Sequence, residues 1–161
     1  MRFLPLVLIV ACATASVPSH FESPVLAYPL NDVTLDRIDV IDSFDTLLRK
    51  SAYGKLGEER AGFLVYEGGR FRLVMWPPTH RFHAEEWQGA IPAGTVAVVH
   101  THPSNQPAPS AHDRYEAERV GVPIIVLTFN SVELVQETGA VRRIRLGMTN
   151  GACCVAYTDR R

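Results

Sequence analysis

The first segment with a regular hydrophobic pattern runs from Leu35 to Ala52. Its apolar residues recur every three positions and then at the adjacent positions 47 and 48, which is close to the 3.6-residue period of a helix. Gly54 follows just past the end of the pattern, where a helix-terminating glycine is common. We therefore expect an amphipathic helix over residues 35–52.

Short apolar runs bounded by glycine and proline follow this helix, and they predict strands. The expected strands cover residues 62–66, 71–76, 95–99, 123–129, 132–135 and 141–146. The first two read as a hairpin, whereas the continuous apolar run 95–99 is typical of a strand buried on both faces. A second helix is expected over 113–120, and residues 79–92, which follow neither period, are expected to form a loop. This order predicts an α/β fold in which helices flank a mixed β-sheet.

The first 15 residues carry a different pattern. Met1-Arg2, an apolar run and Ala13-Thr14-Ala15 predict a signal peptide over residues 1–15. The run is too short for a transmembrane helix, which needs roughly 20 apolar residues. Residues 9–12 also resemble a bacterial lipobox, so the alternative is a lipoprotein signal that ends before Cys12 and a lipid anchor on Cys12. Both interpretations predict an exported protein, periplasmic or secreted, without a transmembrane span.

The length and composition of the chain fit one domain. The whole sequence has 161 residues, of which 47% are hydrophobic and 20% charged. Residues 16–33 contain three prolines and no apolar period, so we expect an extended tether, followed by a folded domain over 34–150 and a tail over 151–161. Cys153 and Cys154 are adjacent, which disfavours a disulfide; they could instead sit as small apolar residues in a terminal strand. The net charge of −1 provides no basic field, so we expect no nucleic-acid partner.

Candidate chemistry is concentrated after the buried strand. His100 and His102 are two residues apart, so on a strand they would present their rings on one face. A proline-rich connector leads to Ser110, at a helix N-cap position, and to Asp113 in the first turn. Ser110 and Asp113 also have the spacing of a capping box, and a histidine pair alone is often only partly exposed. Together, two imidazoles and a carboxylate on rigid elements predict a zinc site with one position open for water, which is typical of catalytic zinc.

Two sequence strings at this point resemble a known family. His100-Thr101-His102-Pro103 followed by Ser110-Ala111-His112-Asp113 resembles the JAMM motif, His-x-His-Pro-x(6)-Ser-x-x-Asp, of the JAB1/MPN/Mov34 zinc metalloproteases. Upstream, the string from Glu59 to Leu64 is similar to the family's Glu-x-x-Gly-x-Leu. The similarity covers about residues 42–146. It implies the family's α/β sandwich, which is similar to that of cytidine deaminases.

The resemblance also implies a role for each matching residue. His100, His102 and Asp113 would ligate one zinc ion, and Glu59 would hold the attacking water and act as general base and then general acid. Ser110 would polarise the substrate carbonyl or hold the oxyanion.

Several neighbouring residues keep alternative interpretations. Glu58 competes with Glu59 for the role of base, although the spacing to the glycine of the motif favours Glu59. His112 lies on a different helix face from Asp113 and is expected at the surface. His80 and His83, in the expected loop, either line a substrate groove or face solvent. Trp76 and Trp87, beside these histidines, are expected to pack against other residues rather than to bind substrate.

The function predicted from these features is zinc-dependent hydrolysis of a peptide or isopeptide bond. An exported enzyme would meet neither ubiquitin nor a cytosolic sulfur carrier in an ordinary bacterium. We therefore expect a peptide or protein substrate in the cell envelope, a peptidoglycan cross-link or a secreted protein tail. The alternative is a catalytically silent protein-binding module, which the complete set of motif residues disfavours.

Overall fold

The computed structural model describes residues 30–55, 57–80, 87–103, 106, 108–149 and 152–156, with the backbone alone for 32–33, 145–149 and 152–156. The predicted signal peptide, Cys12 and most of the predicted tether lie outside these residues. Within the described ranges, no helix has the length and apolar character needed to cross a membrane.

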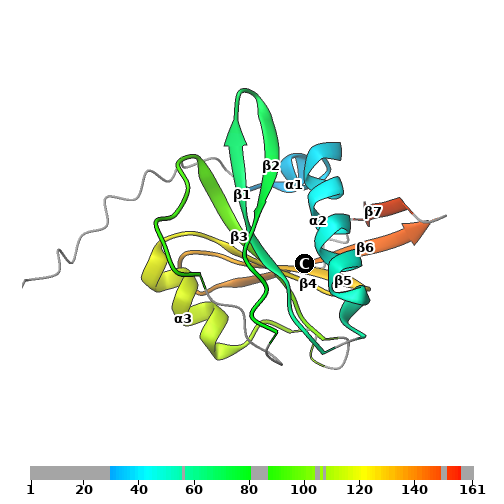
Figure 1. The fold of residues 1–161 in the computed structure, drawn as a ribbon. Helices are drawn as coiled ribbons and strands as arrows, with labels where there is room; N and C mark the ends of the chain where they lie inside the picture. The colour runs from blue at the N-terminus through cyan, green and yellow to red at the C-terminus, as the bar shows by residue number, and fades with distance from the viewer. Residues whose placement is uncertain are drawn as a thin grey trace, which may run out of the picture.

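In the part of the chain that the structure describes, one mixed sheet of seven strands forms the centre of the fold (Figure 1). The elements in chain order are α1 (Asp32–Leu35), α2 (Ile38–Lys50), η1 (Ala52–Gly54), β1 (Ala61–Glu67), β2 (Arg70–Met75), β3 (Thr95–Thr101), α3 (Ala111–Val120), β4 (Ile124–Leu127), β5 (Ser131–Val135), β6 (Val141–Thr149) and β7 (Ala152–Ala156). The strand order is β2-β1-β3-β4-β5-β6-β7. Strands β3 and β4 pair in parallel, and the other neighbours pair antiparallel. The predicted α/β fold with a mixed sheet and flanking helices is confirmed.

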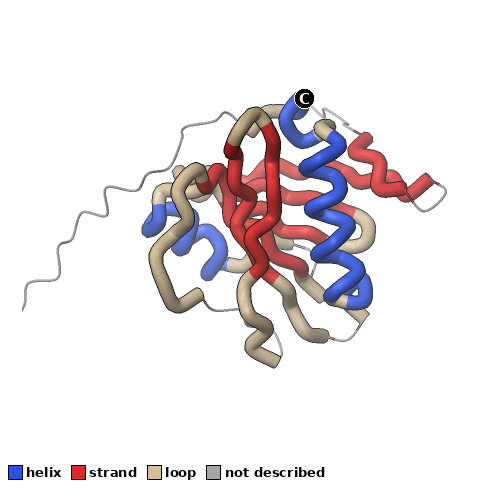
Figure 2. Tube along the Cα trace, turned by 45° about the horizontal axis from the view of Figure 1, so that its top comes forward, coloured by secondary structure: helices blue, strands red, loops and turns tan. Residues whose placement is uncertain are grey.

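The two longer helices cover opposite faces of the sheet. Successive side chains of a strand point to opposite faces of the sheet, so alternate residues of β4 belong to the two hydrophobic layers on either side of it. Ile125 and Leu127 belong to the core cluster that contains the buried residues of α2, whereas Ile124 and Val126 pack in a second cluster with Ala117 of α3. Figure 2 shows α2 lying over the strands, with α3 placed apart from it. The face covered by α3 is the one that carries the predicted chemistry.

The structure differs from the predictions at both ends of the domain. Helix α1 begins at Asp32, inside the predicted tether, because the Asn31 side chain accepts a hydrogen bond from the Thr34 amide at 3.0 Å and so caps this short helix. At the other end, β7 pairs with β6 inside the predicted tail, so the sheet continues past residue 150. Cys153 and Cys154 occupy this terminal strand, and their side chains lie outside the described part of the chain.

Asp39, in the first turn of α2, ties this helix to the hairpin of β1 and β2. Its carboxylate accepts hydrogen bonds from Arg37 Nε at 3.0 Å, from Arg37 Nη2 at 2.8 Å and from the Phe71 amide at 2.9 Å. Arg37 also donates to the Gly69 carbonyl, and its guanidinium lies 5.1 Å from the centroid of the Phe71 ring. These contacts, with the Arg37 hydrogen bonds first, lower the pKa of Asp39 to about 2.

We expect Asp39→Asn to lower the free energy of unfolding by about 1–2 kcal/mol at pH 7. The pKa of Asp39 in the folded protein lies below its ordinary value of 3.8, so its stabilising contribution is present above that value. The contribution is then lost as the pH falls toward 2. Denaturant unfolding at pH 7 and at about pH 2.5 measures the difference between wild type and variant, which should shrink at the lower pH.

The exposed Asp42 of the same helix provides the control. Asp42→Asn should change the free energy of unfolding by no more than about 0.5 kcal/mol. An Asp39→Asn deficit of equal size at both pH values would contradict this account of Asp39.

Candidate metal centre

Strand β3 carries the two histidines to the face of the sheet that α3 covers. Val98 packs in the cluster that contains Ala117 of α3, so His100, two residues further along β3, points to the same face. His102 follows directly after the strand, and its amide donates to the Leu127 carbonyl of β4 at 2.8 Å. Both histidines are 8% exposed. Two nearly buried imidazoles therefore lie at the C-terminal end of β3, which is an inner strand of the sheet.

The start of α3 brings Asp113 to these imidazoles. Ser110 caps the helix: its Oγ accepts from the Asp113 amide at 3.1 Å, and its own amide donates to Asp113 Oδ2 at 2.6 Å. Asp113 Oδ1 lies 3.2 Å from His100 Nε2, and Oδ2 lies 3.5 Å from His102 Nε2. The capping box suggested by the spacing is thus present, and the same carboxylate also faces both histidines.

The electrostatic environment favours the ionised form of Asp113 and the neutral form of His102. Burial alone would raise the pKa of Asp113, but the hydrogen bonds from His100 and Ser110 outweigh burial and hold the pKa well below its usual range. Burial and then the neighbouring His100 lower the pKa of His102. A carboxylate and a neutral imidazole are the forms that bind a metal ion.

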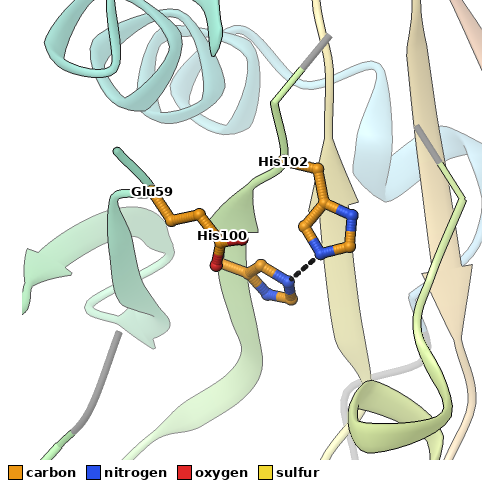
Figure 3. A group of neighbouring side chains, drawn as sticks. All are labelled: Glu59, His100 and His102. Carbon is orange, nitrogen blue, oxygen red and sulfur yellow. Dashed lines mark hydrogen bonds between the residues drawn. The ribbon is translucent and has the colours of Figure 1, made fainter. Parts of the chain in front are cut away.

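The spacing of the three side chains fits a metal ion. The two Nε2 atoms of His100 and His102 lie 3.0 Å apart, joined by the dashed line in Figure 3. With metal–ligand bonds of about 2.0–2.1 Å, two ligand atoms of a tetrahedral zinc site are separated by about 3.3 Å. The distance between the two Nε2 atoms, and those of 3.2 Å from His100 Nε2 to Asp113 Oδ1 and 3.5 Å from His102 Nε2 to the other oxygen, Oδ2, lie on either side of this value. The donor set therefore matches a small divalent ion with little rearrangement.

A backbone carbonyl orients the ring of His102. The Nδ1 atom of His102 donates to the Gln106 carbonyl at 2.9 Å. This bond places the proton on Nδ1 and leaves the lone pair of Nε2 facing His100 and Asp113. Such a partner behind a metal-binding histidine fixes both its tautomer and its orientation.

Glu59 approaches the same group from a segment far away in the sequence. One of its carboxylate oxygens and one ring nitrogen of each histidine lie within 4.8 Å of one another, a group that can hold a metal ion. Figure 3 shows the Glu59 side chain extending toward His100. Glu58 instead pairs with Arg60, with 2.7 Å between Oε2 and Nη2. Of the two glutamates, the structure brings Glu59 to the histidines.

The glycine of the upstream string has a steric explanation. Gly62 lies on β1 opposite Met75 of β2. A Cβ atom on Gly62 would lie 2.8 Å from the Val74 carbonyl oxygen and 2.8 Å from Leu73 Cδ1. Glycine therefore lets β2 lie close against β1, three residues after Glu59.

The remaining sequence candidates lie around this centre in different ways. The Ser110 hydroxyl donates to Asp113 Oδ2 at 2.7 Å, and His112 is exposed on α3. His80 is exposed and its Nδ1 lies 3.8 Å from Glu58 Oε2, whereas His83 lies outside the described residues. The rings of Trp76 and Trp87 each lie 5.2 Å from the Phe63 ring, which supports a packing role.

Comparison with known families matches the chain to a JAB-domain family. Residues 45–146 match the model of Prok-JAB, the prokaryotic homologs of the JAB domain. The match covers more than half of the chain, extends from α2 to β6 and includes all five site residues predicted from the two sequence strings. No curated protein matches the sequence.

Proposed function

The chain belongs to the prokaryotic homologues of the JAB domain, and from this membership we propose that it is a metal-dependent hydrolase of peptide or isopeptide bonds. The observation that carries the proposal is the convergence of one carboxylate oxygen of Glu59 with the ring nitrogens of His100 and His102. The Asp113 carboxylate completes a donor set of two nitrogens and one oxygen, leaving Glu59 beside it. Three ligands and an adjacent base are the arrangement of hydrolytic zinc enzymes.

Each residue of the site has a distinct task in amide hydrolysis. His100, His102 and Asp113 would hold one zinc ion, which when bound supplies a Lewis acid and lowers the pKa of water. Glu59 accepts the proton of the attacking water and then delivers it to the leaving nitrogen, so the amine departs neutral. Ser110, whose hydroxyl donates to Asp113 Oδ2 at 2.7 Å, would turn this one donor from Asp113 toward a developing oxyanion.

We further propose that the substrate is a peptide or protein of the cell envelope or the secreted fraction. The support for this is the N-terminal pattern, which predicts export, with a lipid anchor on Cys12 as the alternative. Substrate identity does not follow from a shared fold, so the relevant amide bond must be found by experiment.

The test of this function is removal and return of the metal. Purified protein should contain one zinc ion per chain and release new peptides from a cell-envelope extract of its host, as detected by mass spectrometry. A chelator should abolish the release, and one equivalent of zinc should restore it. A protein that binds zinc and retains envelope peptides without cleaving them would instead be a binding module. A protein that binds no metal would refute both the site and the function.

A further inference from the structure

We propose that Thr101 and Arg60 form a clamp that positions Glu59 at the metal centre, an inference that rests on the proposed function. Neither residue belongs to the ligand set. Thr101 lies between the two histidines, and Arg60 directly follows Glu59. The bonds between these two residues therefore connect the segment that carries the base to the segment that carries two of the ligands.

The backbone half of the clamp is formed where regular pairing of β1 and β3 ends. The last paired residues are Ala61 and His100. Beyond them the Thr101 amide donates to the Arg60 carbonyl at 2.9 Å, but the Arg60 amide donates to the side-chain Oγ1 of Thr101 at 3.0 Å. Thr101 is 1% exposed, so this hydroxyl is shielded from competing water. A side chain thus replaces a backbone carbonyl as the acceptor for the amide of Arg60, the residue directly after Glu59.

The side-chain half of the clamp acts on the two glutamates. Arg60 Nη1 donates to the Glu59 carbonyl oxygen at 2.8 Å, and Arg60 Nη2 donates to Glu58 Oε2 at 2.7 Å. The Arg60 side chain is only 14% exposed. One guanidinium therefore fixes the peptide plane of Glu59 and also engages the neighbouring carboxylate that could compete with Glu59.

These bonds restrict the backbone on the C-terminal side of Glu59. A general base must stay within hydrogen-bond reach of the proton that it takes, and a displacement of about 1 Å can cost about 100-fold in rate. Thr101 and Arg60 are thus positioning residues, because they act on the reaction only through Glu59.

The test compares three variants of the full-length, zinc-loaded protein. Thr101→Val keeps the branched shape and removes the acceptor, Thr101→Ser keeps the hydroxyl, and Arg60→Met removes the guanidinium. Thr101→Val and Arg60→Met should lower kcat about 10- to 100-fold with little change in KM or zinc affinity. Thr101→Ser should retain most of the wild-type kcat.

Thr95→Val provides the matched control. Thr95 is a buried threonine at the opposite end of β3, and its Oγ1 donates to the Pro92 carbonyl at 2.7 Å. Its substitution likewise removes one buried bond between a threonine hydroxyl and the backbone from the same strand, although here the hydroxyl is the donor, so it should lower stability and leave kcat unchanged. A kcat loss in Thr95→Val equal to that in Thr101→Val would overturn the proposal, because general destabilisation would then explain both.

Amide hydrogen exchange of the metal-free protein gives a second readout that needs no activity. The Arg60 amide should exchange about tenfold faster or more in Thr101→Val, and at nearly the wild-type rate in Thr101→Ser. Unchanged exchange in Thr101→Val overturns the clamp, as does faster exchange with an unchanged kcat. If the wild-type protein binds zinc but cleaves nothing, the proposed function fails and so does the catalytic role of the clamp. Exchange at Arg60 then still decides whether Thr101 secures this segment.

Discussion

Glu59→Gln should abolish amide hydrolysis while the protein still binds its metal ion. Glutamine preserves the size of the side chain and its ability to hydrogen-bond to water, but it cannot accept a proton. Loss of a general base costs about 100- to 10,000-fold, so we expect kcat to fall by at least about 100-fold with KM nearly unchanged. The measurement is steady-state kinetics on an amide substrate identified from the envelope digest, together with metal content by mass spectrometry.

Glu67→Gln serves as the control for this substitution. Glu67 lies at the opposite end of β1, where it is exposed and pairs with Arg72 at 3.1 Å. The same chemical change should leave kcat at the wild-type level, because Glu67 is remote from the histidines. If Glu59→Gln retained wild-type activity, Glu59 could not be the base and the mechanism would be wrong.

His100→Ala should eliminate both metal binding and activity. The substitution leaves a nitrogen and an oxygen to hold the ion, and these come from different segments. Loss of a residue that only hydrogen-bonds to a metal ligand lowers metal affinity by up to about 100-fold. Loss of the ligand His100 itself should therefore lower zinc affinity by at least about 100-fold. Isothermal titration of zinc into the metal-free protein measures this loss, and the kcat of the metal-depleted variant should be undetectable.

Thermal unfolding separates loss of the ligand from loss of the fold. Metal bound only to the native state stabilises wild type by about 2.7 kcal/mol when free metal is 100-fold above Kd. Zinc should therefore raise the Tm of wild type but not that of His100→Ala. His112→Ala is the control, since His112 is exposed on α3 beside Asp113. A zinc-dependent Tm increase of full size in His100→Ala would exclude His100 as a ligand.

Much of the fold could be predicted from the hydrophobic pattern, because α2 buries one face and the central strands β3 and β4 are buried along almost their whole length. The helix expected over 35–52 is present as α2 and η1 but begins at Ile38, because Leu35 is the last residue of the separate helix α1. All six expected strands are present. The terminal strand β7 lies inside the predicted tail, where a strand was only an alternative for Cys153 and Cys154, because five small residues after a glycine carry a weak pattern. Helix α1 was missed for a related reason: four residues are too short for a helical period, and its cap is a single asparagine side chain.

The candidate site could be predicted in part because its side chains have characteristic spacing. His100 and His102 share a face by strand alternation, and Asp113 reaches them because its helix begins at Ser110. The spacing of Ser110 and Asp113 alone could not distinguish a capping box from a metal ligand. In the structure the Asp113 carboxylate does both: it caps the helix and it faces the two histidines. The carbonyl of Gln106 could not have been found, since every residue has one. Thr101 was more accessible to prediction, because a hydroxyl next to two candidate ligands is a chemical signal.

The bond between Arg60 and Thr101 joins residues that are 41 positions apart. Contacts of such long sequence separation form slowly, because the intervening loop must first lose its entropy. The complete centre therefore cannot exist on a nascent or half-folded chain, where the histidine pair alone would bind metal weakly. Binding of the metal ion would then occur at the end of folding. Refolding monitored with a metal-sensitive dye should show uptake of the ion only after β1 and β3 have paired.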